Sequence, residues 1–148
     1  MDISSRGSYP ANKLSNFSPN AFVLDEVECM SMEGFLQSLK YSNPEMQKEI
    51  CRLVGKGAKK AGARKNWRQK QVLYWKGVPY KRSSQEYQEL LDRAFNELAK
   101  NSSFKKALLS TGDSILTHSM GKHKQSETVL TKQEFCSRLM KIRNEISM

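Results

Sequence analysis

Apolar residues recur at the spacing of an α-helix in three stretches of the chain. The first follows Ser31, a residue type favoured at helix starts, and its apolar positions are Met32, Phe35, Leu36 and Leu39. The second follows Ser84, with apolar positions Tyr87, Leu90, Leu91, Ala94, Phe95 and Leu98. The third opens with the capping-box pattern of Thr131 and Glu134 and continues through Phe135, Leu139, Ile142 and Ile146. The spacing predicts three helices, each with one buried face.

Weaker patterns predict two more helices. Asn43 and Pro44 are typical of a helix start and Gly55 of a helix end, and the apolar positions between them are Met46, Ile50, Leu53 and Val54. A short helix is expected around Phe104, Ala107 and Leu108. Residues 55–67 are basic and rich in small side chains, a pattern that fits either a short helix or an open loop.

Two short β-hairpins are predicted, at residues 21–29 and 72–80, the second with Pro79 confining one arm to a sheet edge. Residues 1–13 show little periodicity and are predicted to be a loose segment. The rest contains no tandem repeat and no long linker. The sequence therefore predicts a compact, mostly α single domain over residues 1–148, with a few short strands or hairpins.

Membrane insertion and secretion are not expected. No apolar run approaches the roughly 20 residues of a bilayer-spanning helix, and the chain start lacks the charged and apolar regions of a secretion signal. The three cysteines, Cys29, Cys51 and Cys136, form no C-x-x-C pair, and an odd number argues against a disulfide framework. These features favour a protein of the reducing cytoplasm. The sequence leaves the oligomeric state open.

The chain carries 25 Lys and Arg residues against 15 Asp and Glu residues, a formal net charge of +10. Such an excess favours partners that bear phosphate, whether nucleic acid, a nucleotide or a sugar phosphate. Many basic proteins bind no nucleic acid specifically, so charge alone does not choose among these classes.

A polar ridge on the helix after Ser31 offers candidate chemistry. Glu33, Gln37 and Lys40 stand at i, i+4 and i+7, so they share one side of that helix. A glutamate at a helix start, among other polar side chains, is a candidate for a catalytic carboxylate. A solvated face with a weak ion pair explains the same pattern.

The basic stretch suggests an anion site. Lys56 and Lys65 are interleaved with glycines that let backbone amides approach an anion. Asn66 and Trp67 follow, and a flat aromatic ring beside cations suits stacking on a base. The alternative is a core tryptophan next to solvated charges.

A loop late in the chain holds both histidines, and within it His118, Gly121 and Lys122 are candidate ligand contacts because loops between helices often bind ligands. Two histidines without clustered acids or cysteines do not predict a metal site. Phosphate-binding, dinucleotide-binding and nucleophile-elbow motifs are absent. Neither a metal nor a cofactor is therefore expected.

Five blocks in fixed order carry a family resemblance. They are residues 14–19 (LSNFSP), 31–40 (SMEGFLQSLK), 64–67 (RKNW), 107–112 (ALLSTG) and 139–143 (LMKIR). In this order they resemble the NADAR family, the YbiA-like proteins associated with NAD and ADP-ribose metabolism. The similarity extends over nearly the whole chain.

The resemblance implies a compact helical fold and an N-glycosidase that cleaves the bond between ribose C1′ and a nitrogen. Substrates known for the family include phosphoribosylated intermediates of riboflavin synthesis and ADP-ribose attached to guanine. The family's S-x-E-x-x-x-Q-x-x-K block places its catalytic glutamate at Glu33. Its tryptophan after K-N corresponds to Trp67, and its S-N-F block to Ser15, Asn16 and Phe17.

One block departs from the family pattern. Many members carry W-G-x-G or W-G-D before the final helix, whereas no tryptophan follows Trp75 here and His118, Gly121 and Lys122 stand in that region. Together with Arg6, the departure indicates a divergent subgroup, in which these residues belong to the substrate site.

The sequence therefore suggests roles for each block. Glu33 stabilises a cationic ribose or orients water. Gln37 and Asn16 hold ribose hydroxyls, Trp67 stacks on the base, and Lys40, Lys56 or Lys65 binds phosphate. The +10 charge favours ADP-ribose on a nucleic-acid base. Riboflavin intermediates, or a non-catalytic basic module that binds nucleotide or nucleic acid, are the alternatives.

Overall fold

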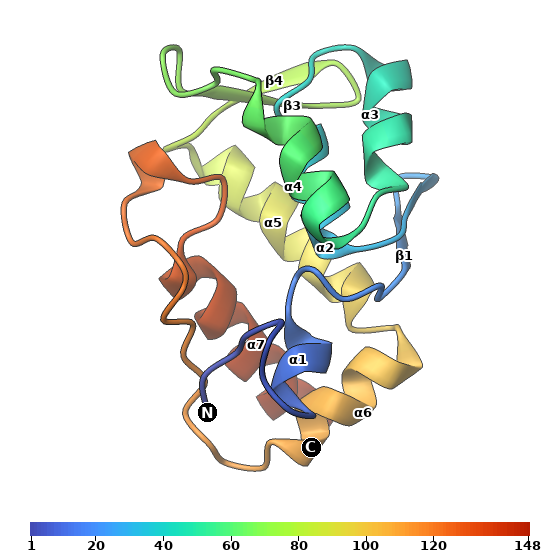
Figure 1. Ribbon diagram of the computed structural model, residues 1–148, viewed down its shortest axis with the longest axis vertical. Helices are drawn as coiled ribbons and strands as arrows, with labels where there is room; N and C mark the ends of the chain where they lie inside the picture. The colour runs from blue at the N-terminus through green and yellow to red at the C-terminus, as the bar shows by residue number, and fades with distance from the viewer.

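The computed structural model describes all residues, 1–148, as helices and two hairpins around one core. In chain order the elements are α1 (Ala11–Leu14), β1 (Phe22–Leu24), β2 (Val27–Cys29), α2 (Met32–Ser38), α3 (Pro44–Cys51), α4 (Gly55–Ala63), β3 (Val72–Trp75), β4 (Val78–Lys81), α5 (Gln85–Leu98), α6 (Ser102–Ser110), the short 3-10 helix η1 (Gln125–Glu127) and α7 (Lys132–Ile146). Figure 1 shows α5 crossing the middle of the molecule, with α2, α3, α4 and β3–β4 on one side and α1, α6 and α7 on the other. The predicted mostly helical architecture is confirmed.

The predicted helix starts are confirmed by their caps. The Ser31 hydroxyl accepts from the Gly34 N–H at 3.0 Å, which satisfies a donor that has no partner inside the helix. Ser84 caps α5 in the same way. At α7, Thr131 and Glu134 exchange hydrogen bonds as a capping box. Both hairpins also form, with antiparallel pairing of β1 with β2 and of β3 with β4.

The buried face of α3 differs from the prediction. Met46 and Val54 are each 40% exposed, whereas Gln47 is buried beside Ile50. The Gln47 amide donates to three backbone carbonyl oxygens and accepts from the Lys76 N–H, so a polar side chain fills the inner face. An apolar-spacing rule cannot identify such a residue as buried, because its hydrogen bonds offset the cost of leaving water. The helix also ends early: Gly55, with φ of +53°, begins α4 instead of ending α3.

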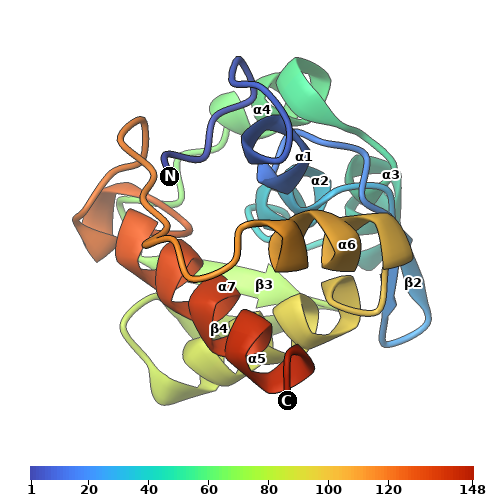
Figure 2. The same ribbon diagram turned by 90° about the horizontal axis from the view of Figure 1, so that it is seen from below.

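The N-terminal segment is more ordered than its sequence pattern predicts. Ile3 is fully buried, and its N–H donates to the Thr117 carbonyl oxygen at 2.8 Å. Asp2 accepts hydrogen bonds from the backbone N–H and the hydroxyl of Ser119. These contacts join the start of the chain to the loop that precedes η1 (Figure 2). The first residues of the chain are therefore ordered by contacts with a segment more than 100 residues away, although their sequence shows no periodicity.

Buried polar pairs join the chain around the start of α5 to the chain around the start of α7. Arg82, whose side chain is 1% exposed, donates two hydrogen bonds to the Glu134 carboxylate. The Tyr87 hydroxyl donates to the Val129 carbonyl oxygen at 2.6 Å.

The three cysteines are free and buried. No helix combines the length and the apolar character needed to span a bilayer.

Candidate functional site

The first turn of α2 holds Glu33 at a junction of three segments. The Ser31 hydroxyl, besides capping α2, donates to the Leu53 carbonyl oxygen at 2.9 Å. The Glu33 N–H donates to the Asn16 carbonyl oxygen at 3.0 Å. The turn at residues 15–17 is therefore fixed against the start of α2, and the structure brings the predicted S-N-F block to Glu33.

Gln37 positions the Glu33 carboxylate. Its Nε2 donates to Glu33 Oε2 at 2.6 Å, and the side chain is buried, as a one-turn spacing on a helix allows. Gln37 Oε1 is buried without a hydrogen-bond partner. The structure thus gives Gln37 a partner inside the chain, where the sequence analysis assigned it to ribose hydroxyls.

Gly62 of α4 makes this arrangement possible. A Cβ atom at this position would lie 1.7 Å from Gln37 Oε1, far inside van der Waals contact. The absence of a side chain lets α4 pack closely on α2 and directly over Gln37. The Gly62 carbonyl oxygen also accepts a hydrogen bond from Lys40 Nζ at 3.4 Å.

Gly62→Ala is expected to displace Gln37 from Glu33, because the buried amide has little free space to move into. Overpacking of this kind costs about 1 to 3 kcal/mol of unfolding free energy. Loss of the Gln37 hydrogen bond should also raise the pKa of Glu33, since that bond favours the ionised carboxylate. Denaturant unfolding and an NMR titration of the carboxyl would measure both effects.

Gly57→Ala is the matched control, because no atom lies within 4 Å of a Cβ placed at Gly57 in the same helix. The control substitution should leave the Glu33 titration unchanged. A Gly62→Ala protein with native stability and an unshifted Glu33 pKa would show that the packing of α4 on Gln37 does not constrain the carboxylate.

The Glu33 carboxyl is largely shielded from water and lies near several positive charges. Burial raises the pKa of Glu33 above its usual value and outweighs the opposing effects. The Gln37 hydrogen bond and the positive charges of Lys40, Lys59 and His118 lower it. A desolvated carboxylate interacts strongly with any positive charge that develops nearby, because little water screens it.

Lys40 is a half-buried cation in the same cluster. Burial lowers the pKa of Lys40 below its usual value, and the Glu33 carboxylate opposes this shift. The charges of Arg68, Lys122 and Lys59 lower the pKa of Lys40 further. Several cations from separate elements therefore surround one carboxyl, which leaves an excess of positive charge suited to phosphate.

The loop after residue 117 contributes His118 and Lys122. His118 Nδ1 lies 2.8 Å from the Ile3 carbonyl oxygen, and the ring packs edge-on against Phe135 at 5.4 Å between centroids. The Lys132 N–H donates to the Lys122 carbonyl oxygen at 2.9 Å. Gly121 is required here, because a Cβ atom would lie 2.7 Å from the His118 ring. Nε2 of His118 has no partner within the chain.

The remaining predicted residues divide into three groups. Asn16 lies beside Glu33, and its Oδ1 is buried without a hydrogen-bond partner. Phe17 borders the start of α4 at Gly55. The structure does not join the last group to this cluster: Arg6, Lys56, Lys65 and Asn66 are exposed, and the Lys65 ammonium lies over the Tyr41 ring.

Trp67 is a core residue. It is 7% exposed and belongs to the main cluster of buried apolar side chains. The structure thus favours the alternative in which the tryptophan packs, because a ring this buried offers no open face for a base.

Trp67→Ala is expected to lower the unfolding free energy by about 3 to 5 kcal/mol, the usual cost of removing a large buried aromatic side chain. Thermal and denaturant unfolding would measure this loss, with Trp67→Phe as a smaller truncation that should lose less. Native stability in the alanine variant, together with weakened ligand binding, would return Trp67 to a stacking role.

Lys59, Gly62 and Arg68 belong to this cluster although their sequence positions did not identify them as site residues. The missing signal was the helical periodicity of residues 55–63, which places Ala58 and Gly62 on the face toward α2 and Lys59 beside them. Arg68 donates to the Glu127 carbonyl oxygen and thereby joins the basic stretch to η1. No group of three or more His, Cys, Asp or Glu side chains is assembled in the chain.

Comparisons with known proteins agree with this architecture. The profile of the family described as bacteriophage protein GP30.3 matches residues 8–144. A 17.1 kDa protein of Enterobacteria phage T4, described as uncharacterized and encoded in the Gp30-rIII intergenic region, is 34% identical over 149 residues, covering 99% of this chain and 98% of its own.

A solved structure also matches. The NMR structure of the Escherichia coli protein YbiA superposes with a TM-score of 0.62 at 16% sequence identity, covering 99% of this chain and 84% of YbiA. The predicted YbiA-like fold is therefore confirmed.

Proposed function

Because the chain belongs to the bacteriophage protein GP30.3 family and has a YbiA-like fold, we propose that it is an N-glycosidase that hydrolyses a ribose C1′–N bond. The substrate we propose is an ADP-ribosylated guanine base in nucleic acid or nucleotide. The observation that carries the proposal is Glu33, a desolvated carboxyl held by Gln37 among cations from the turn after α2, from α4 and from the His118 loop. We place its action in the cytoplasm of the infected host.

The reaction replaces one bond by another without a cofactor. The C1′–N bond breaks and its electron pair leaves with the base nitrogen, which then takes a proton. Water adds its oxygen to C1′ and gives up a proton, so the products are ADP-ribose and the unmodified base. Positive charge develops on the ribose as the bond breaks, and the Glu33 carboxylate stabilises that charge or orients the water.

The neighbours of Glu33 have separate roles in this proposal. Lys40 and Lys122 supply positive charge for the pyrophosphate. Asn16, whose carbonyl oxygen accepts from the Glu33 N–H, holds a ribose hydroxyl. His118 faces the leaving base through its free Nε2. Glu33 has no second carboxyl in this cluster, so the paired-carboxylate scheme of most glycoside hydrolases does not apply.

The experiment compares two substrates by mass spectrometry. The protein and its Glu33→Gln variant are incubated with guanine-ADP-ribosylated DNA and, separately, with a phosphoribosylamino pyrimidine. The proposal predicts release from the DNA that depends on Glu33. Release of ribose phosphate from the pyrimidine alone would assign the site to riboflavin intermediates instead.

A non-catalytic nucleic-acid-binding module is the second candidate, and the observation that favours it is the excess of unpaired cations around α4. Such a module should bind DNA with a steep salt dependence and release nothing from either substrate. Binding without turnover would therefore select this function over the first.

A further inference from the structure

The positive charge of the chain is concentrated in one segment. Eleven of the 25 Lys and Arg residues, and none of the 15 Asp and Glu residues, lie between Ile50 and Gln85. In the rest of the chain the acidic residues outnumber the basic ones by one. The segment folds as α4 and the β3–β4 hairpin, which lie at the same end of the molecule (Figure 1). The net charge is therefore a feature of one region and not of the whole surface.

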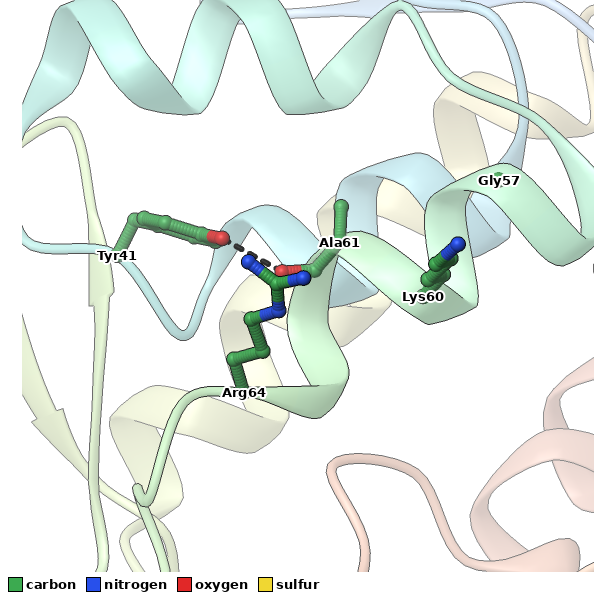
Figure 3. Close-up of a pocket in the computed structure, with 5 residues that line it drawn as sticks. All are labelled: Tyr41, Gly57, Lys60, Ala61 and Arg64. Carbon is green, nitrogen blue, oxygen red and sulfur yellow. Dashed lines mark hydrogen bonds between the residues drawn. The ribbon is translucent and has the colours of Figure 1, made fainter.

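The two flanks of α4 carry different groups. One flank faces α2, where Gly62 packs against Gln37 and the charge of Lys59 acts on Glu33. The other flank lines a hollow of about 310 Å³ with Gly57, Lys60, Ala61 and Arg64, and Tyr41 closes its far side. Gly57 and Ala61 are one turn apart and add little side-chain bulk, which leaves the space open. Figure 3 shows Arg64 extending from the end of α4 toward Ala61 and Tyr41.

Contacts within the chain occupy both the hydroxyl and one ring face of Tyr41. Its hydroxyl donates to the Ala61 carbonyl oxygen (Figure 3). The Lys65 ammonium lies 4.8 Å from the centroid of its ring and covers one face. The hollow therefore offers neither a free hydroxyl nor a fully open ring for reading a base.

The cations around the hollow are available to a ligand. Lys60, Arg64 and Lys65 are exposed, and none of them takes part in the salt bridges of the chain. No acidic residue lies in the lining. Two cations beside a concave surface without an acid are suited to a phosphate group, and phosphate contacts hold a nucleic-acid strand without reading its sequence.

We propose that the hollow between Tyr41 and α4 binds a phosphodiester group of the nucleic-acid strand that carries the modified base, through Lys60 and Arg64. The strand then crosses α4, a helix about 10 to 12 Å wide with its side chains, between the hollow and Glu33. The inference rests on the proposed function and makes a base within a strand the preferred substrate, because a free nucleotide at Glu33 has no further phosphate for this second site.

The test measures binding of unmodified DNA. A fluorescently labelled single-stranded oligonucleotide is titrated by anisotropy at several salt concentrations with the protein, with the Lys60→Gln/Arg64→Gln variant and with a Lys105→Gln/Lys106→Gln control. The control removes two exposed lysines from α6, which lies in the lower half of Figure 1, whereas α4 lies in the upper half. Unfolding curves confirm that each variant is folded.

The slope of log K against log salt should become shallower by roughly 0.7 in the hollow variant, the contribution of one lost phosphate contact on a single strand. The control should keep the slope of the unsubstituted protein. An unchanged slope in the hollow variant, or an equal change in the control, would overturn the proposal.

A second experiment distinguishes failure of this phosphate site from failure of the proposed activity. The hollow variant should keep its turnover of free ADP-ribosylated guanosine and show a raised KM only for the modified oligonucleotide. An equal loss on both substrates would place the hollow in the ADP-ribose site and overturn the strand assignment. If neither substrate is turned over, the proposed function fails, and the anisotropy slopes still decide whether the hollow binds DNA.

Discussion

Glu33→Gln is expected to lower turnover of the ADP-ribosylated substrate by about 10² to 10⁴-fold, the usual contribution of a positioned carboxyl group. Glutamine keeps the shape of the side chain and can still accept from Gln37, but it cannot stabilise a developing positive charge. The fall should appear in kcat, because the lost interaction is made mainly in the transition state.

The same substitution is expected to raise stability at neutral pH. Burial raises the pKa of Glu33 in the folded state, so the ionised carboxylate destabilises the fold and the protonated form does not. The stability gained from the raised pKa is present below the unfolded-state pKa and is lost as pH rises through the folded-state pKa. The stability difference between the variant and the unsubstituted protein should therefore grow as pH rises through that range.

Glu45→Gln provides a matched control for both effects. Glu45 occupies the second position of α3, as Glu33 does in α2, but its side chain is 82% exposed. The control should keep full turnover and a stability profile without the rise at neutral pH. Full turnover in Glu33→Gln, or a variant less stable than the unsubstituted protein at neutral pH, would contradict the role assigned to this carboxyl.

Arg82→Met is expected to lower the unfolding free energy by about 3 to 5 kcal/mol, the range for breaking a buried ion pair by removal of one partner. Arg82 donates to both oxygens of Glu134 and, through Nε, to the Thr128 carbonyl oxygen at 2.8 Å. The substitution leaves a buried carboxylate without its counter-charge. Chemical denaturation near neutral pH would measure the loss.

Glu134 makes the mechanism of this loss testable. Burial alone would raise its pKa, but hydrogen bonds from Arg82, the Thr131 N–H and Gln88 hold the pKa of Glu134 below its usual value. Arg82→Met/Glu134→Gln removes the unpaired charge and keeps a side chain that can complete the capping box. The double variant should therefore recover part of the stability.

Arg93→Met is the surface comparison, because Arg93 pairs with Asp25 while 47% of its side chain is exposed. Its loss should stay within about 1 kcal/mol. If Arg82→Met lost no more than Arg93→Met, or the double variant recovered nothing, the ion pair would not be the source of the stability.

Local signals in the sequence predicted much of the fold. Ser31, Ser84 and Thr131 were identifiable as caps because each satisfies a backbone donor within its own first turn. The inner face of α3 was not predictable in this way, since Gln47 is buried through hydrogen bonds to distant backbone. The order of residues 1–3 likewise depends on residues 115–119.

The candidate site was predictable only in part. The ridge of Glu33, Gln37 and Lys40 follows from helix spacing, and the structure confirms that the first two are joined. The charge of His118 acts on Glu33 although 84 residues separate them, and no local pattern contains that information. For Trp67 the sequence left a stacking role and a core position open, because a basic neighbourhood does not reveal that the ring itself is buried in the core.

The role proposed for Glu33 requires that the C1′–N bond of an ADP-ribosylated base is broken next to its carboxylate. The most direct measurement follows both products of guanine-ADP-ribosylated DNA by mass spectrometry, with the protein and with Glu33→Gln. With the unsubstituted protein we expect the DNA to return to its unmodified mass while free ADP-ribose appears in equal amount, and with Glu33→Gln we expect neither product. DNA that retains a phosphoribosyl group, which indicates cleavage of the pyrophosphate, or a DNA mass that does not change would contradict this role.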